Sequence, residues 1–164
     1  MAPDTFKIEF LDPATQLAEL RPLWLAMRDH HHAITPDWGP VHADDESWAR
    51  RSKDYASWLT EPDAFCLVAR DDGGRAVGYL LATVNAGGPT WVNPERFCYL
   101  ESISVLPELR GQGVGRLLLD AMTAHLDTLG VKSVSVSQVA ANEDARRFYE
   151  RAGFSLAFIQ LTRD

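Results

Sequence analysis

The chain has 164 residues, 46% of them apolar and 24% charged, which is the composition of one ordinary globular domain. No stretch reaches the ~20 apolar residues of a transmembrane helix, and the N-terminus lacks the basic and apolar regions of a signal peptide. With a net charge of −7 the chain also lacks the basic surface that nucleic acid requires, so we expect a cytoplasmic protein without a nucleic-acid or membrane partner.

The first part of the chain is predicted to form one strand and two helices. The strand is expected near residues 5–11, and the helices over 14–32 and 46–59. In the first helix, apolar or aromatic residues recur at steps of three and four, at Leu17, Leu20, Trp24, Met27 and His31. In the second, one face carries Trp48, Tyr55, Trp58 and Leu59. Because amphipathic helices bury one face, both are expected to cover a sheet.

A β-hairpin and a further strand are expected next. Strands predicted over 64–70 and 76–85 flank Asp71-Asp72-Gly73-Gly74, whose residue types favour a tight turn. The next strand is expected over 97–105. Cys66 and Cys98 lie within these strands, and two isolated cysteines of this kind indicate reduced, buried thiols rather than a disulfide or metal site.

The remainder of the chain alternates between helices and strands. We expect a helix over 113–128, a strand over 131–138, a helix over 143–152 and a strand over 154–161, with Gly130 and Gly153 ending the two helices. Hairpin strands followed by a strand-helix-strand unit predict a mixed sheet, antiparallel at first, with helices on its faces. The fold class is therefore α/β (α+β), in a single domain over 1–164.

A glycine-rich segment, Arg110-Gly111-Gln112-Gly113-Val114-Gly115, joins the strand over 97–105 to the next helix. Glycines let the backbone turn tightly and approach an anion, while the free amides and dipole of a helix N-terminus attract it. The segment lacks the Gly-Lys-Ser/Thr of a Walker A loop, and its third glycine comes one residue too early for the dinucleotide motif. We interpret the segment as a phosphate-binding turn of another kind, called the cradle below. The alternative is a glycine-rich turn that binds no ligand.

This cradle resembles the R/Q-x-x-G-x-G/A signature of the GNAT-type N-acetyltransferase superfamily. A second stretch is similar to that superfamily's N-x-x-A-x-x-F-Y-x-x-x-G-F pattern and comprises Asn142, Ala145, Phe148, Tyr149, Gly153 and Phe154. Together the two motifs cover roughly residues 97 to 156. The resemblance implies a mixed, mostly antiparallel sheet in which the strands over 97–105 and 131–138 splay apart.

The resemblance also implies a donor, acetyl-CoA, whose pantetheine arm lies between the splayed strands and whose pyrophosphate lies on the cradle. No metal is implied. The residues expected to bind the donor are Ile103, Ser104, Val105, Arg110, Gly111, Gln112, Gly113, Val114, Gly115, Arg116 and Asn142. A backbone amide near Ile103 or Ser104 would stabilise the charge that develops on the thioester oxygen. Asn142 is equally expected as the N-cap of the helix that begins at Glu143.

Two residues are expected to carry the proton transfers. Glu101, within the strand before the cradle, lies where many members of the superfamily carry a catalytic glutamate, so the resemblance implies that it takes the proton from the amine, directly or through water. A carboxylate in an apolar strand also needs a partner or a wet cleft. The alternative is an ion pair with an arginine, or solvent exposure. Tyr149 matches the general acid of the superfamily and would protonate the leaving thiolate. Its alternative is a side chain at the edge of the core with its hydroxyl in water.

The end of the first helix and the loop after it are expected to border the acceptor pocket. His31 and Trp38 are the predicted substrate-binding residues there, together with Glu101, and one of His30, His31 and His32 could replace Glu101 as the base. The three histidines are not expected to bind a metal, because successive helical residues point about 100° apart.

Acidic residues and tryptophans gather in the same part of the chain. Between Asp29 and Asp63 eight carboxylates stand against three cationic side chains, Arg50, Arg51 and Lys53. They would attract a cationic acceptor, although a solvated helix face explains most of them. The prediction is therefore acetyl transfer to a small cationic primary amine. The alternatives are a protein N-terminal or lysine acetyltransferase and a non-catalytic acyl-CoA sensor, and a homodimer is a further expectation.

Overall fold

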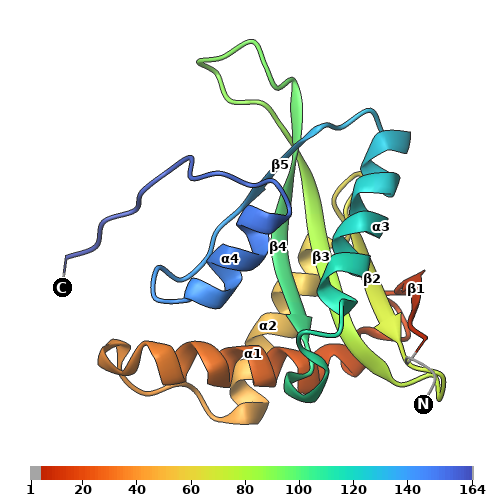
Figure 1. The fold of residues 1–164 in the computed structure, drawn as a ribbon, viewed down its shortest axis with the longest axis vertical. Coiled ribbons are helices and arrows are strands. Elements are labelled where there is room, and N and C mark those ends of the chain that lie inside the picture. The colour runs from red at the N-terminus through yellow and green to blue at the C-terminus, as the bar shows by residue number, and fades with distance from the viewer. Residues whose placement is uncertain (1–4, 164) are drawn as a thin grey trace.

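A computed structural model describes residues 5–163 and contains one five-stranded sheet with the strand order β1-β2-β3-β4-β5 (Figure 1). The strands are β1 (Lys7–Phe10), β2 (Phe65–Arg70), β3 (Ala76–Ala86), β4 (Arg96–Val105) and β5 (Ser133–Val136). Neighbours from β1 to β4 are antiparallel, and β5 runs parallel to β4. The mixed, mostly antiparallel sheet that the sequence predicts is confirmed.

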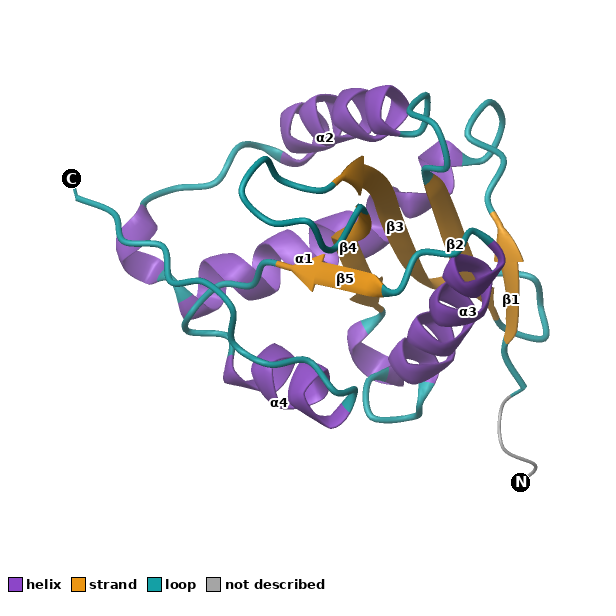
Figure 2. Cartoon of the chain, turned by 90° about the horizontal axis from the view of Figure 1, so that it is seen from above, coloured by secondary structure: helices purple, strands orange, loops and turns teal. Residues whose placement is uncertain are grey.

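Helices cover both faces of this sheet, and α2 and α3 lie on opposite sides of it (Figure 2). The four α-helices of the described chain are α1 (Arg21–Ile34), α2 (Asp44–Trp58), α3 (Val114–Thr128) and α4 (Glu143–Arg151). Three short 3-10 turns accompany them, η1 (Leu17–Leu20), η2 (Pro36–Trp38) and η3 (Pro107–Leu109). Within residues 5–163 no helix combines the length and apolarity needed to cross a membrane.

The α3 side of the sheet is packed by aliphatic side chains. Leu118, Met122 and Leu126 of α3 are buried against the strands. Gly78 of β3 lets the helix approach, because a Cβ there would lie 3.2 Å from both the Ser104 carbonyl oxygen and a Val114 methyl carbon. The close contact between α3 and the sheet fixes the start of the helix that follows the cradle.

The α1 and α2 side contains a buried network of three hydroxyls. The Tyr55 and Tyr79 hydroxyl oxygens lie 2.7 Å apart, and each lies within 2.8 Å of Ser102 Oγ. Burial raises the pKa of Tyr55 to about 12, so its hydroxyl stays protonated. Because every hydroxyl in the network has a partner, it joins α2 to β3 and β4 without an unsatisfied buried group.

Several predicted boundaries differ from the structure for local reasons. The first helix starts at Arg21 instead of residue 14, because Pro22 lacks an N–H and occupies the first turn of α1. It ends at Ile34, two residues before Pro36. Strand β5 has four residues instead of the expected eight, and the hairpin turn forms as predicted, with Gly74 at φ 80°.

The strand predicted over 154–161 was wrong. Residues after Gly153 have no partner strand within the described chain, and the segment runs outward beyond α4 (Figure 1). An alternating apolar pattern forms a strand only where a neighbour pairs with its backbone groups. Large apolar side chains are therefore left exposed, namely Leu156, Phe158, Ile159 and Leu161.

Two neighbouring leucines of α3 test how strongly this helix stabilises the fold. Leu118 is fully buried, whereas Leu117 is 41% exposed. We expect Leu118→Ala to lower the free energy of unfolding by about 2–5 kcal/mol, because it leaves a cavity. Leu117→Ala should cost less than about 0.5 kcal/mol. Urea denaturation measures both, and equal losses would contradict the packing described for α3.

Candidate active site

The glycine-rich segment forms an open turn between η3 and the N-terminus of α3. Gly111 and Gly113 have φ values of 78° and 88°, a left-handed conformation that favours glycine. A Cβ built on either would meet no protein atom within 4 Å. No side chain caps the helix at Gly113, so the first amides of α3 have no side-chain partner at the cap. This geometry suits a phosphate or pyrophosphate.

The polar side chains of the cradle differ in how their groups are satisfied. Arg110 Nε donates to the Val105 carbonyl at 3.3 Å, and Gln112 Nε2 donates to the Glu108 carbonyl at 3.2 Å. Arg116 is paired with Asp120 at 2.8 Å. Within residues 5–163 Arg110 has no carboxylate partner, so of the two cradle arginines it has more charge to offer an anion.

Gly115 has a packing reason that the motif alone did not reveal. A Cβ at this position would lie 3.2 Å from two ring atoms of Phe148 in α4. The glycine therefore lets α3 pack closely against α4, the helix that carries Tyr149. Val114, the first residue of α3, is buried in the core and offers only its backbone to the cradle.

The two central strands separate next to the cradle, as predicted. Pairing between β4 and β5 runs from Phe97↔Ser133 to Leu100↔Val136, where β5 ends. β4 continues to Val105, so the edge of residues 101–105 toward β5 has no paired strand in the described chain. Ser104 Oγ donates to the Leu23 carbonyl at 2.9 Å, and the Ser104 backbone pairs with Tyr79 of β3. The backbone groups that face the unpaired edge are therefore those of Ile103 and Val105, and not those of Ser104.

Glu101 is an extra residue in β4 at the point where the strands separate. Leu81 pairs with Ser102, but the next residue of β3, Ala82, pairs with Leu100. Such a bulge can re-aim a side chain. The Glu101 carboxylate accepts a hydrogen bond from Thr83 Oγ1 at 2.8 Å, and Thr83 lies on the face of β3 that Leu81 shares. Glu101 and its neighbour Ser102 therefore both lie on the α1 and α2 side of the sheet.

The surroundings of Glu101 act on its charge in opposite directions. Burial raises the pKa of the Glu101 carboxyl above its usual value, the Thr83 hydrogen bond lowers it, Glu61 raises it and Arg51 lowers it. The ion pair considered as an alternative for Glu101 does not occur within the described residues; its hydrogen-bond partner is a neutral hydroxyl. Sequence reasoning missed Thr83, because strand register decides which residues lie opposite Glu101.

Tyr149 lies on α4 with its ring among aromatic neighbours. Its ring centroid lies 5.3 Å from that of Phe148 and 5.4 Å from that of Phe154, and the residue is 9% exposed. Burial raises the pKa of the phenol, so it holds its proton at neutral pH. Its hydroxyl has no hydrogen-bond partner within residues 5–163. Asn142 caps this helix, its side-chain oxygen accepting from the Ala145 amide at 3.1 Å, as expected.

Comparison with known proteins shows the family. The model of the acetyltransferase (GNAT) family matches residues 24–154. The chain belongs to this family. It is 37% identical to a mycothiol acetyltransferase of Propionibacterium freudenreichii subsp. shermanii over 127 residues, which cover 77% of this chain and 36% of that protein. It is 28% identical to the N-alpha-acetyltransferase 60 of Xenopus tropicalis, covering 74% of this chain and 52% of the relative.

Solved structures agree on the GNAT fold. A complex of the aminoglycoside N-acetyltransferase AAC(6')-Iy with CoA matches with a TM-score of 0.70 and 20% identity, covering 98% of this chain and 95% of that one. At this identity the likeness concerns the fold. The chain spans between about a third and a half of the length of the two curated relatives above.

Two predicted acceptor residues of this GNAT domain line the same pocket. His31 and Trp38 lie in a hollow formed by the end of α1, η2 and the start of α2. Trp38 is 75% exposed at its rim. Burial, then His30 and Arg110, lower the pKa of His31, which favours its neutral form. Among the described residues Glu101 is not part of this lining, so the structure does not bring all three predicted acceptor residues into one pocket.

Most of the clustered carboxylates form exposed ion pairs. Arg28 contacts both Asp29 and Asp44, at 2.6 and 2.7 Å, while Arg50 contacts Glu46 at 2.8 Å. The solvated helix face that the sequence also allowed therefore accounts for these side chains, and they do not by themselves form a site for a cationic acceptor.

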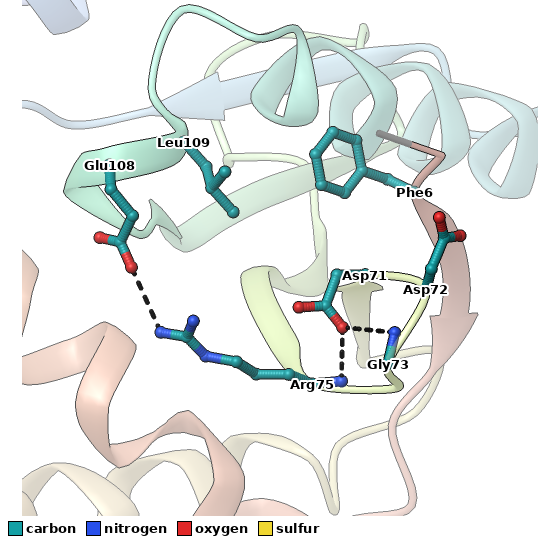
Figure 3. A pocket seen from close by; sticks show the side chains of 7 residues that line it. All are labelled: Phe6, Asp71, Asp72, Gly73, Arg75, Glu108 and Leu109. Atoms are coloured by element: carbon teal, nitrogen blue, oxygen red, sulfur yellow. Dashed lines mark hydrogen bonds and ion pairs between the residues drawn. The ribbon is translucent and has the colours of Figure 1, made fainter. Parts of the chain in front are cut away.

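A second hollow lies beside the β2–β3 hairpin (Figure 3). There Asp71 Oδ1 accepts from the backbone amides of Gly73 and Arg75, and the Arg75 guanidinium pairs with Glu108 at 3.2 Å. These contacts close the turn, and we assign this hollow no part in the chemistry.

Two glycines that flank α3 allow a controlled test of the cradle. We expect Gly113→Glu to abolish acetyl-CoA binding in calorimetric titration, because a side chain and a negative charge would enter the open turn. Gly130→Glu is the control, since Gly130 ends the same helix with a left-handed φ of 68° and faces no protein atom within 4 Å. The Gly130→Glu variant should bear similar backbone strain and still bind acetyl-CoA. Unimpaired binding by Gly113→Glu would contradict the assignment of the cradle.

Proposed function

We propose that the chain transfers the acetyl group of acetyl-CoA directly to the primary amine of a small molecule that arrives as a cationic ammonium. The observation that carries this proposal is the arrangement along one strand. β4 places Glu101 where it separates from β5, offers an unpaired edge over 103–105, and leads into the open amides of the cradle. A base, a binding edge and an anion site thus follow one another within fifteen residues.

The residues that would hold the donor fit its chemistry. When bound, acetyl-CoA supplies an acetyl group activated as a thioester. The amides of Gly111, Gly113 and Gly115, with Arg110, would bind its pyrophosphate, because they present donors and a helix dipole to an anion. Gln112, Val114 and Arg116 would contribute from the same turn. The backbone groups of Ile103 and Val105 that face away from β3 would pair with the pantetheine arm, and Asn142 would hold the start of α4.

Glu101 and Tyr149 would move the two protons. An alkylammonium with a pKa near ~10.4 has no lone pair at neutral pH, so Glu101 would accept its proton at a carboxylate oxygen, directly or through water. Tyr149 would donate its phenolic proton to the sulfur that leaves. Its raised pKa suits a donor that must be protonated before the reaction. His31 is the second candidate for the base, since its neutral form is favoured.

The relatives support two acceptor classes. Mycothiol acetyltransferase and the structurally similar aminoglycoside N-acetyltransferase favour a small-molecule amine. The similarity to N-alpha-acetyltransferase 60 favours the alternative, a protein N-terminus, and a non-catalytic sensor is a third possibility. We favour the small molecule because the higher identity is to the mycothiol enzyme.

A homodimer remains a prediction. The outer edge of β5 is unpaired in the described chain, and Leu156, Phe158 and Ile159 are exposed nearby in sequence, after α4. Association of two copies of the chain would cover an unpaired strand edge and exposed apolar side chains of this kind.

The pH dependence of turnover tests Glu101. Since its folded pKa is raised above its usual value, the fraction of carboxylate, and with it kcat/KM, should fall as the pH drops through that raised pKa. Glu101→Gln should lower kcat/KM by about 10²–10⁴ and remove this acidic limb. Glu95→Gln, an exposed change before β4, is the control. If the acidic limb is unchanged in Glu101→Gln, another residue is the base, and His31 is the first candidate.

Removal of one hydroxyl tests Tyr149. We expect Tyr149→Phe to keep the aromatic contacts with Phe148 and Phe154, and hence the melting temperature and acetyl-CoA affinity. Its kcat should fall by about 10² because the thiolate then leaves without a proton. Stopped-flow detection of free thiol measures the rate, and a wild-type rate in this variant would remove the role of Tyr149.

A further inference from the structure

Arg51 is held in the middle of α2 by three aromatic rings. Its guanidinium carbon lies 4.3 Å from the ring centroid of Trp24 and 5.6 Å from those of Tyr55 and Trp58. Trp24 is itself fixed, because its Nε1 donates to Ser47 Oγ at 3.3 Å. Cation–π contacts of this kind orient the guanidinium without using its N–H donors.

These donors have few partners. Within residues 5–163 the guanidinium makes no hydrogen bond, and its one ion pair, with Asp54, is long at 4.0 Å. The adjacent Arg50, by contrast, is bound to Glu46 at 2.8 Å. The Arg51 side chain is only 28% exposed. A partly desolvated cation whose donors are free is costly to keep, and the aromatic faces offset part of that cost.

Arg51 lies on the same side of the sheet as Glu101. The Tyr55 ring beneath it carries the hydroxyl that donates to Ser102 Oγ at 2.8 Å, and Ser102 follows Glu101 in the bulge of β4. The positive charge of Arg51 also lowers the pKa of the Glu101 carboxyl against the effect of burial. Arg51 therefore lies on the same side of the sheet as the proposed base, and its charge acts on the Glu101 carboxyl.

We infer that Arg51 is a specificity-determining residue that binds an oxyanion, a carboxylate or a phosphate, carried by the acceptor a few bonds from its amine. A guanidinium offers a planar pair of donors that matches both groups. The acceptor would then be dipolar, with its ammonium at Glu101 and its oxyanion at Arg51. The inference rests on the proposed acetyl transfer and narrows its substrate class.

Matched pairs of amines test this inference. The pairs are L-phenylalanine with L-phenylalaninamide and phosphoethanolamine with ethanolamine, each assayed with saturating acetyl-CoA. We expect Arg51→Met to raise KM at least about tenfold for the oxyanion-bearing member of the preferred pair, and less than about twofold for the partner that lacks the oxyanion. The KM of the variant is compared with that of wild type on the same acceptor, so differences in basicity between the amines do not affect the ratio. If wild type prefers L-phenylalanine, the oxyanion is a carboxylate, and if it prefers phosphoethanolamine, the oxyanion is a phosphate.

Two further variants separate binding from structure. Arg50→Met removes a charge from the exposed face of α2 and should leave every KM unchanged. Arg51→Lys keeps the charge but loses the planar pair of donors, so its KM should be intermediate. Equal changes within both pairs, or turnover of only the amines that lack the oxyanion, would overturn the inference.

Binding is followed separately by saturation-transfer NMR on the complex of the protein with CoA. Oxyanion-bearing amines that bind to wild type but not to Arg51→Met would support the inference even without turnover. If neither the carboxylate-bearing nor the phosphate-bearing amine binds to wild type, the inference is overturned. The proposed function fails in a different way, by absent acetyl-CoA binding or by absent acetylation of every amine.

Discussion

The arrangement of the site depends on one extra residue in β4. Up to Leu100 the strand pairs regularly with β3 and β5, and from Ser102 onward it pairs with β3 alone. The bulge at Glu101 places two consecutive side chains on the same face, one in the site and one in the buried hydroxyl network. Because Tyr55 and Tyr79 both bind Ser102, the bulge is fixed from α2 and from β3. A slip of one residue would break this network and turn Glu101 away.

Two glycines set the packing on the α3 side of the sheet. Gly78 allows α3 to approach the sheet, and Gly115 allows α4 to approach α3. Together they determine where Tyr149 lies relative to the unpaired edge of β4. Gly111 and Gly113 serve a different purpose, since added Cβ atoms there would point into open space. The motif glycines thus divide into Gly115, which packing requires, and Gly111 and Gly113, which border open space, a distinction that spacing alone does not show.

Much of this fold could be predicted from the sequence because its signals are local. Periodicity located the helices and most strands, and glycines located the cradle and the ends of α3 and α4. The failures involve non-local partners. The strand over 154–161 has the right alternation but no neighbour. The resemblance implies that a bulge is common in the strand over 97–105, but its position at Glu101 depends on register with β3. For the same reason Thr83 and Arg51 could not be placed beside Glu101. The catalytic roles of Glu101 and Tyr149 remain predictions.

The electrostatics of Glu101 connect acceptor choice with base strength. A base must be ionised before it can take a proton, and burial opposes ionisation while Thr83 and Arg51 favour it. A stronger base also needs a higher pKa. If the oxyanion of an acceptor binds Arg51, it neutralises the charge that lowers the pKa of Glu101, so that pKa rises. Of two acceptors that bring the same ammonium to Glu101, the one that also carries an oxyanion would therefore leave Glu101 with the higher pKa. An amine without the oxyanion would leave Arg51 charged and Glu101 the weaker base, so Arg51 would favour the matching acceptor both in binding and in proton removal.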